Sequence, residues 1–271
     1  MHPKSDCPPL PELASLSIEG PDAAAFLQAQ LTADVAAMPP DRWSPAAWCD
    51  PRGRVLAVML VLPGPPTFLV ALPGPVAEQV RTRMDMFRIG RKVTISVGKE
   101  AGPGGNGAPL AHDPDRRLGI PDSPPSEADR AAWWAAEVDA GMPWILPDTA
   151  GRFLPQMLGL ERLGGLSYRK GCYPGQEVVA RVHYRGRVTQ RLARFELLGP
   201  APGAGQALDL GDCAGTVLYA VDIRAAVPTS RGLMVVPANA RPEPGGSGDS
   251  HSRTLRWALV EPNHAVLPSG P

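Results

Sequence analysis

Residues 164–177 have the sequence GGLSYRKGCYPGQE, the most informative stretch of the chain. Four of its first twelve residues are glycine, the residue that lets a backbone turn tightly or approach another group closely. From Gln176 onward the residues are compatible with a helix, although Val178 and Val179 also suit a strand. The stretch therefore predicts a tight loop that leads into a short regular element.

Cys172 lies within this loop and follows Arg169 and Lys170. If a helix begins at Gln176, the thiol lies just before a helix N-terminus and close to two cations, and both conditions favour the thiolate over the thiol. This is the environment of a reactive cysteine. The alternative is a buried cysteine that only fills space, and the residues alone leave both interpretations open.

The eight residues KGCYPGQE, Lys170–Glu177, closely resemble the KGCYxGQE signature of the YgfZ family, in which the fifth position varies. Seven fixed positions of eight match, so the resemblance is specific. Three other stretches are similar to family segments: GPDAAAFLQAQLTAD at 20–34, WCDPRGRV at 48–55 and FLPQMLGL at 153–160. The resemblance covers roughly residues 10–198, and the rest agrees in pattern only.

The resemblance implies an α+β protein with a three-domain, cloverleaf-like folate-binding fold of the aminomethyltransferase type. We expect a split β-α-β N-terminal domain at residues 1–98. A second α+β folate-binding domain that carries KGCYPGQE is expected at 99–187, and a small C-terminal β-barrel at 188–271.

Apolar periodicity supplies the elements of these domains. The first hundred residues alternate strand and helix patterns, as in a split β-α-β unit, with helices expected after Gly20-Pro21 and along the apolar face Val76, Val80, Met84 and Phe87. Residues 98–122 have no period and are dense in glycine and proline, which predicts a loop and a domain junction. A helix is expected from Ser126 to Gly141. Short strands follow from Val188, the last at Thr254–Glu261.

The function implied by the resemblance is binding of tetrahydrofolate or a related folate, in support of iron–sulfur cluster assembly or repair. The expected partners are iron–sulfur client enzymes, including a tRNA-modifying one. The alternative is a folate-dependent one-carbon transferase of the aminomethyltransferase type, so whether the protein is an enzyme stays open. The KGCY motif favours the first function, because the aminomethyltransferases lack it.

The same resemblance assigns individual residues. Trp133 lies eight residues before Gly141 and corresponds to a folate-contacting tryptophan, whereas Leu13 replaces the second such tryptophan. Cys172 is assigned as a redox residue or transient ligand together with Lys170. The other residues expected to contact folate are Asp34, Asp50, Arg52, Tyr173, Gln176 and Glu177.

Structural roles compete with several of these assignments. Asp50 and Arg52 also suit a plain hairpin turn, Asp34 suits a surface position at a helix end, and Trp133 suits the core. The basic run Arg181, Arg185, Arg187, Arg191 and Arg194, with His183, could bind RNA or a polyglutamate tail, or be a solvated face. His112 is expected in a loop without a functional role.

Composition and charge argue against several other classes of protein. The chain has 27 basic and 27 acidic residues, so the long-range positive field typical of nucleic-acid binding is not expected. The longest apolar run, Val55–Leu62, is too short to cross a bilayer, and the N-terminus lacks signal-peptide character. We expect a cytoplasmic protein. Its cysteines, Cys7, Cys49, Cys172 and Cys213, lack metal-ligand spacing, so no metal site is predicted.

Overall fold

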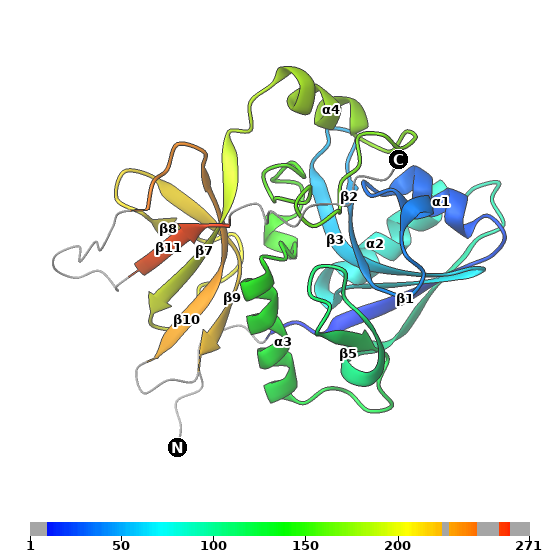
Figure 1. Ribbon diagram of the computed structural model, residues 1–271, viewed down its shortest axis with the longest axis horizontal. Helices are drawn as coiled ribbons and strands as arrows, with labels where there is room; N and C mark the ends of the chain where they lie inside the picture. Colours follow the sequence, from blue (N-terminus) through cyan, green and yellow to red (C-terminus); the bar gives the residue numbers. More distant parts are fainter. Residues whose placement is uncertain (1–9, 224–227, 243–254, 261–271) are drawn as a thin grey trace.

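The computed structural model describes residues 10–223, 228–242 and 255–260. It contains two antiparallel sheets, and helix α3 lies between them (Figure 1). The α+β class and the β-rich C-terminal part predicted from the sequence are confirmed. Cys7, Thr254 and Glu261, which entered the sequence predictions, lie outside the described residues. In the described part of the chain, no helix is both long and apolar enough to cross a membrane.

The first sheet has the strand order β2-β3-β4-β1-β5-β6, and every neighbouring pair is antiparallel. Two helices cover one face of this sheet with the buried side chains that apolar periodicity predicted. Phe87 is the exception, because it ends its helix and is half exposed. The elements are β1 (Leu13–Glu19), α1 (Ala23–Gln30), β2 (Ser44–Cys49), β3 (Val55–Gly64), β4 (Thr67–Pro73), α2 (Gly74–Phe87), β5 (Thr94–Pro109) and β6 (Arg117–Gly119), with a 3₁₀ turn at Val35–Ala37.

Strand β5 corrects the expectation of a loop from residue 98 onward. It continues to Pro109, across the proposed domain boundary at 98, and pairs with β6. The glycines serve close packing here: a Cβ on Gly107 would lie 2.3 Å from the backbone oxygen of Leu118. Glycine inside a strand marks such close approach as well as loops, and the sequence pattern does not separate the two.

Helix α3 (Glu127–Ala140) forms where predicted. The side chains and backbone amides of Ser126 and Asp129 form a reciprocal capping box at its start, and Gly141 ends it with a left-handed φ of 67°. Trp133 and Trp134 are buried on the helix. Because α3 contacts strands of both sheets, its apolar side chains belong to a core that the two halves of the molecule share.

The second sheet has the order β11-β7-β10-β9-β8 and forms the other half of the molecule (Figure 1). Its own core packs on one face, and Leu218, Tyr219, Leu233 and Val235 join the shared core around α3. Its strands are β7 (Gln190–Leu198), β8 (Ala207–Asp209), β9 (Ala214–Ile223), β10 (Thr229–Pro237) and β11 (Leu255–Leu259).

Between α3 and β7 the chain is irregular except for a 3₁₀ turn at Pro147–Thr149 and helix α4 (Gln176–Arg185). The latter is the helix expected to follow the glycine-rich loop. Val179 is its one buried residue, and the rest of the helix stands out from the body of the molecule at the top of Figure 1.

Candidate functional site

The loop that carries the signature motif is fastened to the C-terminal end of α1 by Lys170. Its buried ammonium group donates hydrogen bonds to the backbone oxygens of Gln28 and Leu31, each at 2.5 Å. These are carbonyl groups at a helix end, where a cation also interacts favourably with the helix dipole. Burial lowers the pKa of Lys170 to about 8, although the nearby Asp34 carboxylate acts in the opposite direction. The predicted site residue Lys170 therefore acts as a helix cap.

Thr32 makes a second attachment for the same loop. Its hydroxyl donates to the backbone oxygen of Gly165 at 2.6 Å and accepts from the backbone amide of Ala47 at 2.9 Å. The backbone oxygen of Thr32 accepts from Ser167 at 2.9 Å. The loop is therefore tied to both α1 and the first sheet.

The hairpin turn between β2 and β3 packs against the start of α4. Gly175 has a φ of 80°, and a Cβ there would lie 2.5 Å from the backbone oxygen of Asp50, so only glycine fits this approach. One carboxylate oxygen of Asp50 accepts from the backbone amides of Arg52 and Arg54 at 2.9 and 2.8 Å. Asp50 thus builds its own turn, while the side chain of Arg52 is exposed.

Cys172 is exposed, and it precedes a buried residue, Tyr173. The Lys170 ammonium group lies 5.1 Å from the centre of the Tyr173 ring, and burial raises the pKa of the Tyr173 hydroxyl. Gln176 donates to the backbone oxygen of Lys170 at 3.4 Å, and Glu177 is exposed in the first turn of α4. An accessible thiol is thus held on a loop whose neighbouring side chains point inward.

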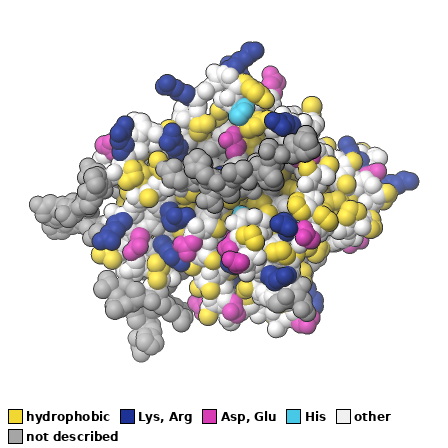
Figure 2. All heavy atoms as spheres, in the orientation of Figure 1, with side chains coloured by type: hydrophobic (Ala, Val, Ile, Leu, Met, Phe, Trp, Pro, Cys, Tyr) yellow, Lys and Arg dark blue, Asp and Glu magenta, His cyan; other side chains and the backbone are white. Residues whose placement is uncertain are grey.

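A mixed basic and aromatic surface continues from this loop along α4. Tyr184 is 68% exposed, and the rings of Tyr168 and His183 stack with their centres 3.8 Å apart. Figure 2 shows basic, histidine and apolar side chains together at the top of the molecule, where α4 lies. Arg194, the last residue of the predicted basic run, has a different role, since it donates to the backbone oxygens of Val138 and Asp139 at the end of α3.

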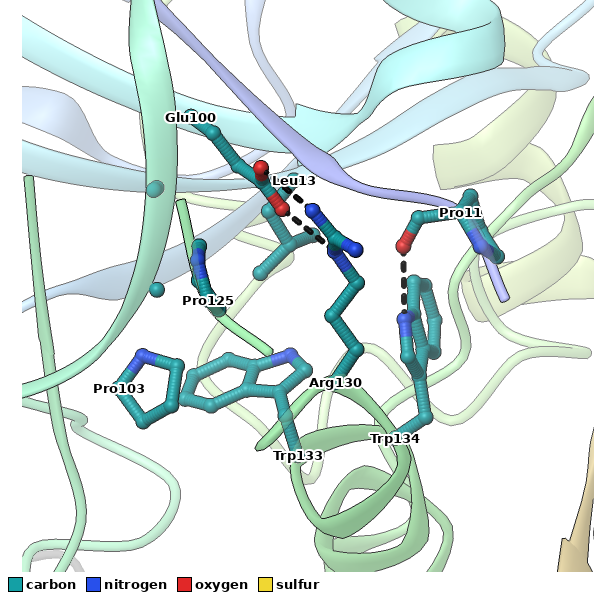
Figure 3. Close-up of a pocket in the computed structure, with 10 residues that line it drawn as sticks. Pro11, Leu13, Glu100, Pro103, Pro125, Arg130, Trp133 and Trp134 are labelled. Carbon is teal, nitrogen blue, oxygen red and sulfur yellow. Dashed lines mark hydrogen bonds and ion pairs between the residues drawn. The ribbon is translucent and has the colours of Figure 1, made fainter. Parts of the chain in front are cut away.

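Trp133 belongs to a second group of residues, on α3 and away from α4 (Figure 1). Its indole lines a small pocket of about 10 Å³ where the start of β1, the middle of β5 and α3 meet (Figure 3). Leu13 lines the same pocket and is paired with Ala101 of β5. The structure therefore brings together the two positions that the sequence singled out as a folate-contacting residue and its missing partner.

An ion pair that the sequence did not predict lines this pocket. Arg130 donates from Nε and Nη2 to the two carboxylate oxygens of Glu100, each at 2.8 Å. Next to it, the indole nitrogen of Trp134 donates to the backbone oxygen of Pro11 at 2.9 Å, whereas the buried indole nitrogen of Trp133 has no hydrogen-bond partner. The pocket thus combines an aromatic ring, a carboxylate and a guanidinium group.

A buried polar network lies beside Trp133. The fully buried Glu137 accepts from Arg116 at 2.6 Å and from the indole nitrogen of Trp144 at 2.8 Å, and lies 3.3 Å from Nε2 of His112. Burial would raise the pKa of Glu137, but His112 and Arg116 together hold it below its ordinary value. The Arg116 guanidinium group also lies 4.9 Å from the centre of the Trp133 ring.

His112 lies in the loop between β5 and β6 as expected, but the expectation that it has no role is wrong, because its side chain is completely buried beside Glu137. One feature of the sequence indicated a buried polar group at this place. Glu137 follows Trp133 by four residues and Trp134 by three, so it lies on the buried face of the helix. A carboxylate there requires a partner. In residues 10–223, 228–242 and 255–260, this group included, no cluster of three or more His, Cys, Asp or Glu side chains could hold a metal ion.

Comparison with known proteins finds relatives that share one name. The chain is 30% identical to the tRNA-modifying protein YgfZ of Klebsiella pneumoniae, over 79% of this chain and 80% of that protein. It is also 30% identical to the protein of the same name from Edwardsiella ictaluri, over 76% and 77% of the two chains. No family model matches the sequence.

Among solved structures, the glycine cleavage system aminomethyltransferase T of Bartonella henselae has a similar fold. The TM-score is 0.62 over 84% of this chain and 77% of that one, with 13% sequence identity. This likeness confirms the predicted aminomethyltransferase-type fold and, at such low identity, concerns the fold alone.

Proposed function

This chain belongs to the YgfZ family, and on that premise we propose that it binds a reduced folate and supports the assembly or repair of iron–sulfur clusters in other proteins. Tetrahydrofolate or a close derivative is the proposed ligand. The proposed clients are iron–sulfur enzymes, with tRNA-modifying enzymes among them, in keeping with the name of the relatives.

The observation that carries the folate proposal is the convergence of Leu13 and Trp133 on one pocket. A pterin is a flat heteroaromatic ring with several hydrogen-bond donors, and an indole provides a surface for stacking on it. Glu100 and Arg130 add a carboxylate for donor groups and a cation for the negatively charged tail. The side chains present thus suit a folate in chemistry.

The size of the pocket sets a condition on binding. A cavity of about 10 Å³ has room for about one water molecule, so a folate enters only when the side chains that close the pocket move apart. Part of the binding free energy is therefore spent on opening the pocket, which lowers the affinity expected.

The proposal for iron–sulfur clusters depends on Cys172. Its thiol is exposed, whereas Cys49 is buried and burial raises the pKa of that thiol. Thiolate sulfur is the usual protein ligand of iron–sulfur clusters. We propose that Cys172 contacts the cluster of a client as a transient ligand or redox partner, with the loop held in place by Lys170. Exposed residues of α4 next to this loop would contact the client protein.

Isothermal titration calorimetry with 5-formyltetrahydrofolate, a stable reduced folate, tests the proposal directly. We expect saturable binding to the full-length protein with a dissociation constant in the micromolar range or weaker. Absence of binding at millimolar ligand would refute the folate proposal. Turnover of an aminomethylated lipoyl carrier protein would instead identify a one-carbon transferase, the alternative that the sequence left open.

A further inference from the structure

The ion pair between Glu100 and Arg130 has the geometry of a ligand contact. Arg130 presents two neighbouring N–H groups, and each reaches a different oxygen of the same carboxylate at 2.8 Å. Such a two-point contact is both stronger and more directional than a single hydrogen bond. In Figure 3 the guanidinium group lies over the pocket, between Leu13 and the two tryptophans.

The two side chains of this ion pair differ in how deeply they are buried. The side chain of Glu100 is 12% exposed and that of Arg130 is 30% exposed, so the carboxylate is the inner partner. A carboxylate at this depth requires hydrogen-bond donors, because leaving it unpaired has a large free-energy cost. The outer partner, Arg130, reaches solvent more easily and can leave first.

The pterin ring of a folate carries the same pair of donors as Arg130. Its 2-amino group and the neighbouring N3–H lie side by side in one plane, as do Nε–H and Nη2–H of arginine. We infer that Glu100 recognises this donor edge of the pterin and that Arg130 occupies its place in the free protein. This inference rests on the proposed folate binding and names the residue that selects the ring.

Exchange of one donor pair for the other limits the free-energy cost of opening the closed pocket. Glu100 keeps two hydrogen bonds throughout, and the indole of Trp133 gains a ring to stack on. The unpartnered indole nitrogen of Trp133 also becomes available to an acceptor on the ligand. Arg130, once released, lies at the outer side of the pocket, where the carboxylates of the folate tail provide a new partner.

The test compares two ligands by calorimetry: 5-formyltetrahydrofolate, and its analogue with a methyl group in place of the 2-amino group. We expect the wild-type protein to prefer the amino compound by about 10- to 100-fold, the range of hydrogen bonds to a charged group. Glu100→Gln should reduce this preference to about threefold or less, because an amide offers one acceptor and turns a donor toward the ring.

A second variant separates recognition from packing. Arg130→Met keeps most of the apolar stem, and it should retain the preference for the amino compound because Glu100 remains. If the pair only joins α3 to β5, both variants should behave alike. Glu127→Gln, an exposed carboxylate in the first turn of α3, is the matched control and should match the wild type.

The outcomes are distinct. An unchanged preference in Glu100→Gln, or an equal loss in Arg130→Met, would overturn the inference. Equal binding of the two compounds to the wild-type protein would remove Glu100 from ring recognition and leave the folate proposal standing. If the wild-type protein binds neither compound, the folate proposal itself fails.

Discussion

The side chain of Lys170 donates to the backbone oxygen of Leu31, 139 residues earlier in the chain. This contact connects the signature loop to the end of α1 and leaves the ammonium group buried. Lys170, the cation of the KGCYPGQE motif, thus fixes the position of the loop, and its contribution to stability can be measured.

Lys170→Met should destabilise the protein by about 2–3 kcal/mol, because two carbonyl oxygens lose their donor in a buried place. Chemical denaturation at pH 7 measures this difference in the free energy of unfolding. Lys92→Met, at an exposed position, is the control and should change stability by less than about 0.5 kcal/mol. An equally small effect at Lys170 would contradict the capping role.

The stability difference between the wild type and Lys170→Met should also depend on pH. The folded-state pKa of Lys170 is about 8, below the ordinary 10.5, so between these values the unfolded chain binds more protons. The stability contributed by this group therefore rises with pH through that window. Denaturation at pH 7 and pH 9.5 should show the stability difference between the two proteins growing by about 1 kcal/mol. This value is smaller than the full pKa shift would give, because solvent screens part of the interaction. A constant difference would show that burial does not perturb Lys170.

Trp133→Leu should weaken folate binding by about 1–3 kcal/mol, the range for loss of a buried aromatic contact. Calorimetry gives the affinity, and thermal unfolding of the free variant shows whether the fold persists. Because Leu13 offers no second ring, we expect micromolar affinity at best in the wild type. Unchanged affinity in Trp133→Leu would mean that the indole only packs in the core.

Glu137→Gln should destabilise the protein by about 3 kcal/mol at pH 7, because the Arg116 guanidinium group loses its buried counter-charge. The pKa of Glu137 is lowered on folding, so its contribution is complete above the ordinary value of 4.5 and declines as the pH falls below it. Unfolding at pH 7, 5 and 4 should show the two proteins converging in acid. Parallel curves would contradict an ionised Glu137.

Cys172→Ala should fold and bind folate like the wild type, since the exposed thiol lies outside the pocket around Trp133. It should fail to restore iron–sulfur enzyme activity in cells that lack the native protein. Cys213→Ala, which removes a partly exposed thiol between β8 and β9, is the control and should restore it. Full rescue by Cys172→Ala would leave the cysteine without a chemical role.

Local sequence signals predicted most of the elements. The helix after Gly20-Pro21 and the capped helix from Ser126 to Gly141 formed where proline, capping residues and apolar spacing placed them. The continuation of strand β5 beyond residue 98 was missed because glycine and proline are common both in loops and where backbones approach closely. Glycine has no side chain, so a glycine-rich strand shows no alternation of apolar and polar side chains in its sequence.

The site was predictable only where a motif carried it. Cys172, Tyr173 and Gln176 came from the signature, and the structure brings them together with Lys170. Glu100 and Arg130 were not predicted, because two charged residues 30 positions apart show no periodic relation. Their pairing is a property of how β5 and α3 pack, which appears only in three dimensions.

The position of α3 between the two sheets has a consequence for how the chain can be divided. Trp134 contacts Trp144 and also Tyr219 of the second sheet, with ring centres 6.0 and 5.1 Å apart. A recombinant fragment that ends before α3 would expose the apolar side of the first sheet, and a fragment that begins after it would expose that of the second. Each half would then carry a large exposed apolar patch, which favours aggregation, so the protein is best expressed and engineered as one piece.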